Sequence, residues 1–260
     1  NVRKNNGILA NPADVLITDG GQEALYLVMQ ALLDPGDEIL VPDPRYTSYD
    51  AAIAQAGAKM VLVPTYAEDN FDVRPGEVEA AITPATKAIL IISPSNPTSA
   101  VVSPANLRAI AEIARKHDLI VISDEIYERY IYAPAQQLSV ASLPGMYERT
   151  ITLGGFSKTY AMTGWRVGYV IAPADFIATL TAVKGATTGP IAPVAQWAAL
   201  AAATGPQDIV DQYREIYNRR RLMMMDGLRQ LGFSFTEPQG AFFVYTNAAS
   251  SGIEAFELSY

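Results

Sequence analysis

The chain has 260 residues, of which 50% are hydrophobic and 18% are charged. This length suits one large domain and part of a second, and the composition excludes a disordered protein because a sizeable core can be buried. The net charge of −8 argues against a non-specific nucleic-acid binder, which needs a basic face. Without cysteine, and with His117 as its single histidine, the sequence offers no disulfide, thiolate metal site or multi-histidine cluster.

The sequence contains no apolar run of the length that crosses a bilayer, so we expect no membrane partner. Its most apolar stretch, residues 190–203, is alanine-rich and interrupted by Pro193 and Gln196, and we interpret it as a buried helix. The N-terminus lacks the apolar segment of a secretory signal, which makes the cytoplasm the expected location. The first residue is not methionine and the last residues resemble an unfinished unit, so we expect a chain truncated at both ends.

Short apolar runs alternate with helical patterns through most of the chain. Continuous runs such as Ala-Ile-Leu-Ile-Ile are typical of strands that are covered on both faces. Their alternation with helices predicts a mostly parallel α/β sheet. In chain order, we predict strands at residues 15–18, 38–41, 59–63, 88–92, 119–122 and 150–153, and helices at residues 22–33, 49–56 and 104–117.

The later part of the chain is predicted to leave this sheet. A strand at residues 167–171 follows the strand at residues 150–153 after only a loop, so this pair is expected to be antiparallel. A long helix over residues 209–231 comes next, and residues 241–245 are predicted to form the first strand of a smaller domain. The predicted parts are a large domain over residues 1–207, a connecting helix over residues 208–231 and an incomplete small domain over residues 232–260.

Three features are interpreted as structural. The arginine triplet at residues 219–221 is expected on a solvated face of the long helix, and the methionine triplet at residues 223–225 in core and hinge packing. His117 ends a predicted helix, where a positive or polar side chain suits the helix dipole.

Polar residues follow several of the predicted strands at the point where each strand ends. Ligand sites in open parallel sheets lie at the carboxyl ends of the strands, so these residues are expected to converge. They are a glycine pair, an amide, a carboxylate, a lysine and an arginine: Gly20 and Gly21, Asn96, Asp124, Lys158 and Arg166. This combination indicates a site for an anionic cofactor with an electrophilic carbonyl.

At these positions the sequence resembles the class I/II, fold-type I pyridoxal-phosphate-dependent aminotransferases, and among them the prokaryotic aspartate, alanine and aromatic aminotransferases. The motifs occur in the family's order and spacing over nearly the whole chain. They are Gly-Gly-Gln-Glu-Ala-Leu at residues 20–25, Asn-Pro-Thr at residues 96–98, Asp-Glu-Ile-Tyr at residues 124–127 and the stretch at residues 157–168. The resemblance implies a mostly parallel, seven-stranded α/β sheet with helices on both faces, followed by the start of a small α+β domain.

The resemblance implies that Lys158 carries the aldehyde of pyridoxal 5'-phosphate as a Schiff base and moves a proton between substrate and cofactor. An amine can do this only if its pKa is lowered, which burial beside a cationic group supplies. Asp124 is implied to pair with the pyridine nitrogen and keep it protonated. An aspartate after a strand can also cap a helix, which is the alternative interpretation of Asp124.

The remaining implied contacts hold the ring and the phosphate of the cofactor. Asn96 and Tyr127 are implied to hydrogen-bond the phenolic oxygen, and Tyr46 to stack on the pyridine ring. Arg166 is implied to grip the phosphate together with backbone N–H groups at a helix N-terminus. The residues that provide this N-terminus are Gly20, Gly21 and Gln22.

Two positions depart from the family's usual pattern. Family members commonly have a phosphate-binding serine three positions before the lysine, where this chain has Gly155. We expect Ser157 or Gln22 to take over that contact. They also usually read Asn-Pro-Thr-Gly, whereas this chain has Ser99 at the fourth position, and we expect this change to alter only a turn.

The predicted function is the exchange of an amino group between an L-amino acid and a 2-oxo acid by a ping-pong mechanism. The resemblance also implies a homodimer, with no metal, nucleic acid or membrane as partner. A pyridoxal-phosphate-dependent C–S β-lyase or a related lyase shares every residue named and stays an alternative. A nucleotide-binding module lacks its Gly-x-Gly-x-x-Gly fingerprint here, and an inactive scaffold is the last alternative. The amino acid substrate is left open, because the family's substrate-carboxylate arginine has no match in the chain.

Overall fold

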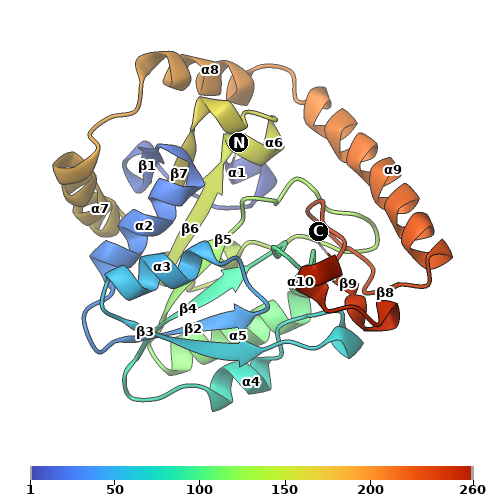
Figure 1. Ribbon diagram of the computed structural model, residues 1–260. Coiled ribbons are helices and arrows are strands. Elements are labelled where there is room, and N and C mark those ends of the chain that lie inside the picture. The colour runs from blue at the N-terminus through green and yellow to red at the C-terminus, as the bar shows by residue number, and fades with distance from the viewer. Residues whose placement is uncertain (1, 259–260) are drawn as a thin grey trace.

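A seven-stranded sheet lies at the centre of the molecule (Figure 1). The computed structural model describes residues 2–258, apart from the side chains of Ser250 and Phe256. The strands are β1 (Val15–Thr18), β2 (Glu38–Asp43), β3 (Lys59–Pro64), β4 (Thr86–Ile92), β5 (Ile120–Asp124), β6 (Thr150–Gly155) and β7 (Gly168–Ile171). Their order is β1-β7-β6-β5-β4-β2-β3, and only β7 runs antiparallel to its neighbours. The mostly parallel sheet and its antiparallel strand are therefore confirmed.

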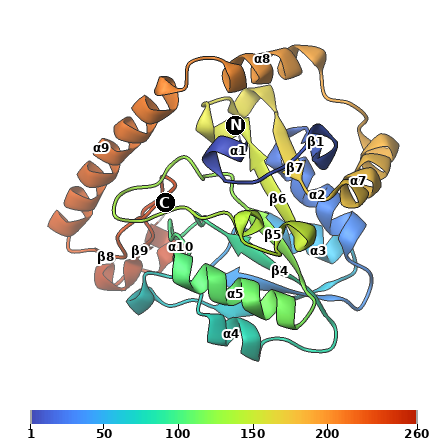
Figure 2. The same cartoon turned by 180° about the vertical axis from the view of Figure 1, so that it is seen from behind.

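Helices cover both faces of the sheet, as the front and back views show (Figures 1 and 2). One face carries α2 (Gly20–Leu32), α3 (Ser48–Gln55) and α7 (Ala174–Thr187). The other face carries α4 (Pro75–Ala80) and α5 (Pro104–Lys116). The sheet is thus the middle layer of three, as the continuous apolar runs predict.

The central strand β4 shows how one short sequence serves two hydrophobic cores. Ala88, Leu90 and Ile92 pack in the core on the α2 side, whereas Ile89 and Ile91 pack in the core on the α5 side. Successive side chains of a strand point to opposite faces, so a strand between two helical layers needs apolar residues at every position.

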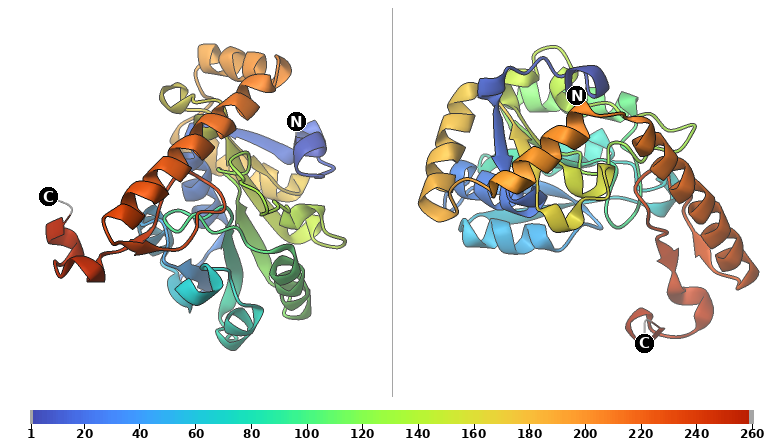
Figure 3. Two further views of the ribbon diagram at one scale, coloured as in Figure 1. Left: turned by 90° about the vertical axis from the view of Figure 1, so that its right-hand side faces the viewer. Right: turned by 90° about the horizontal axis from the view of Figure 1, so that it is seen from above.

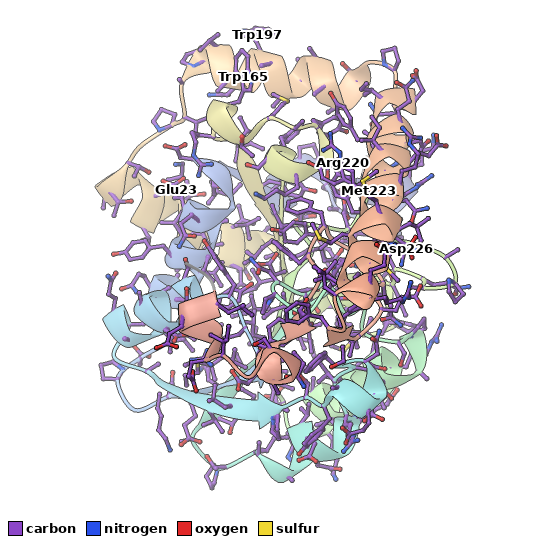
Figure 4. All side chains as sticks on the ribbon, turned by 45° about the vertical axis from the view of Figure 1, so that its right-hand side comes forward. Glu23, Trp165, Trp197, Arg220, Met223 and Asp226 are labelled. Atoms are coloured by element: carbon purple, nitrogen blue, oxygen red, sulfur yellow. The ribbon has the colours of Figure 1, made fainter. Side chains whose placement is uncertain are left out.

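The helix α8 (Pro193–Thr204) lies on the surface, so the prediction of a buried helix at residues 190–203 is wrong. Only the small side chains of Ala195 and Ala199 are buried, one turn apart, and they pack in a cluster with Val167. Trp197 points away from the sheet and is 70% exposed (Figure 4). The composition of this helix indicates its apolar character but not its orientation. The face that packs on the protein is the one that carries Ala195 and Ala199.

The long helix α9 (Asp208–Gln230) leaves the sheet, as the turned views show (Figure 3), and confirms the helix predicted over residues 209–231. The arginine triplet is not wholly solvated. The side chain of Arg221 is 10% exposed, donates to the Pro238 carbonyl at 2.8 Å and lies over the Tyr132 ring. The methionine triplet is mostly not core, since Met223 is 76% exposed and only the last of the three is buried.

Residues 241–245 form a loop, so the strand predicted there is wrong. The small two-stranded sheet is instead made by β8 (Ser234–Phe235) and β9 (Thr246–Asn247). The backbone of Ala241 is held by the large domain: its N–H donates to the Tyr130 carbonyl at 2.9 Å, and its carbonyl accepts from the Tyr132 hydroxyl at 2.7 Å. These long-range partners replace the strand ladder that the apolar pattern indicated.

The other helices are short. They are α1 (Val2–Asn5), α6 (Phe156–Thr159), α10 (Ala255–Leu258) and the 3₁₀ turns Pro12–Asp14, Ala67–Asp69, Val140–Ser142, Tyr147–Arg149, Thr163–Trp165 and Ala248–Ser251. Within residues 2–258, no helix combines the length and apolarity needed to cross a membrane. The same part of the chain contains no cluster of side chains suited to hold a metal ion.

A buried carboxylate, Glu125, lies directly behind the carboxyl end of β5 and is only 2% exposed. Its Oε1 accepts hydrogen bonds from the hydroxyls of Ser123 at 2.9 Å and Ser139 at 2.7 Å, and its Oε2 accepts from the Asn6 amide at 2.9 Å. Burial, reinforced by the neighbouring Glu128 carboxylate, raises the pKa of Glu125 to about 7 despite these donors.

This raised pKa predicts a pH-dependent stability. Because the folded-state pKa lies above the ordinary 4.5, the contribution of Glu125 is fully present below pH 4.5 and is lost as the pH rises to about 7. Glu125→Gln should remove a change of roughly 3 kcal/mol across this window. Denaturant unfolding of both proteins at a series of pH values measures it, with the exposed Glu148→Gln as the control. Parallel stability curves for wild type and Glu125→Gln would contradict the assignment.

Candidate active site

A cavity of about 410 Å³ opens at the carboxyl ends of the central strands. Ile92, Asp124 and Leu153 are register partners at the ends of β4, β5 and β6, and all three line it. Every predicted site residue except Gly20 also lines the cavity, namely Gly21, Gln22, Tyr46, Asn96, Asp124, Tyr127, Ser157, Lys158 and Arg166. Because the strands are parallel, their carboxyl ends bring together side chains that are far apart in the sequence.

Lys158 lies in the short helix α6, which follows β6 directly. Its Nζ atom is 6.0 Å from the ring centroid of Tyr127 and 5.7 Å from that of Phe242, and it lines the cavity. Burial, and to a lesser degree the positive charge of Arg166, lowers the pKa of the Lys158 amine below its usual value. The amine thus has the property that a nucleophile or a proton-transfer group needs.

Asp124 ends β5 with both carboxylate oxygens engaged. Oδ2 accepts a hydrogen bond from the Tyr49 hydroxyl at 2.6 Å, and Oδ1 accepts from the Ile126 backbone N–H at 3.1 Å. Burial raises the pKa of Asp124, while these two donors oppose the rise by stabilising the ionised form. The helix-cap alternative is wrong, because a turn and not a helix follows Asp124.

Tyr49 is a site residue that the sequence analysis missed. It is 1% exposed, lines the cavity and packs edge-on against Tyr46, with ring centroids 5.8 Å apart. The available signal was its position one helical turn after Tyr46, which places both rings on one face of the chain. Its partner Asp124 is far away in the sequence, and that pairing has no local signature.

The opposite end of the cavity is built for an anion. Arg166 donates from Nη2 to the Asp19 carbonyl at 3.4 Å, just before the N-terminus of α2. Gly20 has φ +75°, and a Cβ there would lie 2.3 Å from the same Nη2. A Cβ on Gly168 would lie 2.5 Å from the Gly20 carbonyl carbon. Glycine is therefore required at both positions for the arginine and the helix N-terminus to meet.

Gly155 stands where family members commonly have a phosphate-binding serine, and the structure gives a steric reason for the glycine. A Cβ at this position would lie 2.8 Å from the Ile126 Cδ1 atom and 3.3 Å from the Val167 carbonyl oxygen, so a serine would have to displace its neighbours. Ser157 is 8% exposed and lines the cavity, as does Gln22. Both residues expected to replace the missing hydroxyl are thus present at the site.

Ser99 does more than alter a turn, so that expectation is wrong. It adopts φ 59°, and its hydroxyl donates to the Phe243 carbonyl at 3.0 Å and accepts from the Phe243 N–H at 3.2 Å. Phe243 and its neighbour Phe242 line the cavity, and the sequence analysis did not single out either of them. The loop after Asn96 therefore fixes the aromatic wall that the C-terminal segment contributes.

The geometry predicts the effect of removing the Tyr49 hydroxyl. Tyr49→Phe takes away one hydrogen-bond donor to the Asp124 carboxylate, so the pKa of Asp124 should rise further above its usual value. Carbon-13 NMR titration of aspartate-labelled protein measures this directly, with Tyr26→Phe as a control on the same core. An unchanged Asp124 titration in Tyr49→Phe would show that the hydrogen bond does not stabilise the carboxylate.

Comparisons with known proteins identify the family of this chain. The sequence model of the family described as "Aminotransferase class I and II" matches residues 2–258. The aspartate aminotransferase of Geobacillus stearothermophilus is 38% identical over 97% of this chain and 65% of its own length. The aspartate aminotransferase of Pyrococcus abyssi is 40% identical over 99% of this chain and 67% of its own length. This chain thus spans about two thirds of the length of these relatives.

A solved structure shows the same relationship in three dimensions. The aromatic aminotransferase from Pyrococcus horikoshii OT3 superimposes with a TM-score of 0.95 at 40% sequence identity, over 99% of this chain and 70% of that one. Such agreement in sequence and in fold goes well beyond a shared sheet topology. The chain belongs to the aminotransferase class I and II family, whose enzymes work with pyridoxal 5'-phosphate.

Proposed function

We propose that this protein is a pyridoxal-phosphate-dependent aminotransferase that exchanges an amino group between an L-amino acid and a 2-oxo acid. One observation carries the proposal: the Lys158 amine, with its lowered pKa, and the partly buried Asp124 carboxylate line one cavity together with an anion cradle, formed by Arg166 and the N-terminus of α2. The relatives named aspartate and aromatic aminotransferases support a transfer reaction over the lyase alternative.

The residues at the site fit the cofactor group by group. The amine of Lys158 suits an aldehyde, and the carboxylate of Asp124 suits a protonated pyridine nitrogen. The α2 N-terminus and Arg166 suit a phosphate, because orphan N–H groups and a guanidinium fork both favour a dianion. Bound pyridoxal phosphate supplies an electron sink for the bond that breaks at the substrate α-carbon.

The residues that line the cavity have different proposed roles in the reaction. Lys158, whose Nζ atom lies beside the rings of Tyr127 and Phe242, would take the proton from the substrate α-carbon and return it to the C4′ carbon of the cofactor. Asp124 would pair with the protonated pyridine nitrogen, and the hydrogen bond from Tyr49 favours the ionised form of that carboxylate against the effect of burial. Asn96 and Tyr127, which both line the cavity, would hydrogen-bond the cofactor's phenolic oxygen.

Further parts of the proposal concern organisation. We propose a large domain over residues 1–207, a connecting helix over residues 208–231 and part of a small domain over residues 232–260, with residues 1, 259 and 260 outside the described range. The direction of α9 away from the sheet supports this division (Figure 3). A homodimer is proposed as well, and the exposed Trp197 of α8 supports an assembly. A cytoplasmic location stays a prediction from the sequence.

The central test is covalent attachment at Lys158. After incubation with pyridoxal phosphate and reduction with borohydride, wild-type protein should carry the cofactor's mass on the peptide that contains Lys158. Lys158→Ala should lose this label and all measurable amino transfer, because Lys158 is the only lysine among the described residues that line the cavity. The exposed Lys87→Ala serves as the control. Equal labelling of Lys158→Ala and wild type would show that Lys158 is not the residue to which the cofactor attaches.

A second test addresses Asp124. Asp124→Asn keeps the shape and burial of the side chain but loses its charge, so cofactor should still bind while kcat falls on the order of 10²-fold or more. Steady-state transamination with an amino acid and a 2-oxo acid measures the loss. Wild-type turnover in Asp124→Asn would remove the carboxylate from the mechanism, and release of ammonia without an oxo-acid acceptor would favour the lyase alternative.

A further inference from the structure

A buried ion pair lies behind the N-terminal end of α2. Glu23 in the first turn of α2 and Lys184 in the last turn of α7 have side chains only 9% and 6% exposed, with Nζ and Oε2 2.7 Å apart. Figure 4 labels Glu23 at the start of α2, beside α7. Neither residue lines the cavity. Burying two charges costs free energy that a pair seldom recovers in stability, so this pair calls for another role.

The Glu23 carboxylate accepts hydrogen bonds from three donors in two other segments, the loop after β1 and the end of α7. Oε2 accepts from the Lys184 amine and from the Asp19 backbone N–H at 2.6 Å, and Oε1 accepts from the Thr188 hydroxyl. Lys184 also donates to the Thr188 hydroxyl oxygen at 3.0 Å. Burial raises the pKa of Glu23, but the donors outweigh it and hold the pKa below its usual value. One carboxylate thus joins the loop after β1, the start of α2 and the end of α7.

The peptide units of Asp19 connect this cluster to the anion cradle. The Asp19 N–H donates to Glu23, while the Asp19 carbonyl accepts from Arg166. Gly20 and Gly21 follow at once and start α2. Any movement of the Glu23 carboxylate therefore displaces the arginine partner and the first N–H groups of α2 together.

The charge of Lys184 also matters for an anion at the cradle. A carboxylate in the first turn of a helix interacts well with the helix dipole, but it repels a second anion bound at the same N-terminus. Lys184 neutralises Glu23 inside the protein, where screening by salt is weak. Glu23 thus keeps the hydrogen bond from the Asp19 N–H, while its repulsion of an anion bound at the cradle is removed.

We propose that Glu23, Lys184 and Thr188 form a lock that positions the phosphate end of the cofactor site. They are positioning residues, since they act through Asp19, Arg166 and the start of α2 without lining the cavity. The inference rests on the proposed function, because it assigns the cradle to the cofactor's phosphate. It predicts that changes in these residues weaken binding of the cofactor's phosphate group and leave binding of its ring and aldehyde unaffected.

The experiment compares binding of pyridoxal 5'-phosphate with binding of pyridoxal, which lacks the phosphate, by absorbance titration. Glu23→Gln and Lys184→Met should each weaken binding of the phosphorylated compound by about tenfold or more and leave pyridoxal binding within about twofold. The double variant should lose no more than the worse single variant, because the two residues act as one unit.

A second carboxylate with the same types of donor, but with a lysine partner that is 70% exposed, serves as the control. Glu38 accepts from the Lys59 amine at 2.7 Å and from the Thr83 hydroxyl at 2.6 Å, at the start of β2 and away from the cavity. Glu38→Gln should leave both affinities unchanged. If circular dichroism shows that the Glu23 and Lys184 variants are unfolded, Thr188→Val is measured instead. Its affinity for the phosphorylated compound should fall by about two- to tenfold, and its affinity for pyridoxal should not change.

The outcomes separate the lock from the proposed function. If wild type prefers the phosphorylated compound and the folded variants keep the same preference, the lock is wrong and the proposed function stands. Equal weakening of both compounds in the variants would also overturn the lock, because it indicates a general structural role. If wild type shows no preference for the phosphorylated compound, the assignment of the cradle fails, and the lock fails with it.

Discussion

The register of three parallel strands, β4, β5 and β6, holds the site together. The register that pairs Ile92 with Asp124 and Asp124 with Leu153 sets the level at which the polar residues emerge. A slip of one residue would turn each strand's core face towards the wrong helical layer, so the two hydrophobic cores enforce this register. The positions of the Lys158 amine and the Asp124 carboxylate thus depend on apolar packing below them.

Hydroxyl and amide groups donate hydrogen bonds to the carboxylates at the carboxyl end of β5. Asp124 is served by Tyr49 and a backbone N–H, and the adjacent Glu125 by two serines and an asparagine. Glu23 adds a cationic partner. Burial raises the pKa of all three carboxylates, and the direction of the net shift depends on how far hydrogen-bond donors and neighbouring charges offset it. The cation Lys184 lowers the pKa of Glu23, whereas the anion Glu128 raises that of Glu125.

The two ends of the cavity are fixed in different ways. The anion end relies on the absence of side chains, because Gly20 and Gly168 let Arg166 and the start of α2 approach closely. The aromatic end relies on a hydroxyl, because Ser99 ties the backbone of Phe243 to the loop after β4. Contacts of the second kind join the C-terminal segment to the sheet, which a strand at residues 241–245 would not have done.

Local periodicity and strand-end position by themselves determined most of the fold and the predicted site residues. Apolar runs located the strands, and polar residues just after them located Asn96, Asp124 and Lys158 at one edge, because parallel strands share a direction. Tertiary structure alone decided the partners of these groups. Tyr49 meets Asp124 across 75 residues, and Lys184 meets Glu23 across 161. A hydrogen bond between distant segments has no period in the sequence, so only packing could select Tyr49, Phe242 and the exposed face of α8.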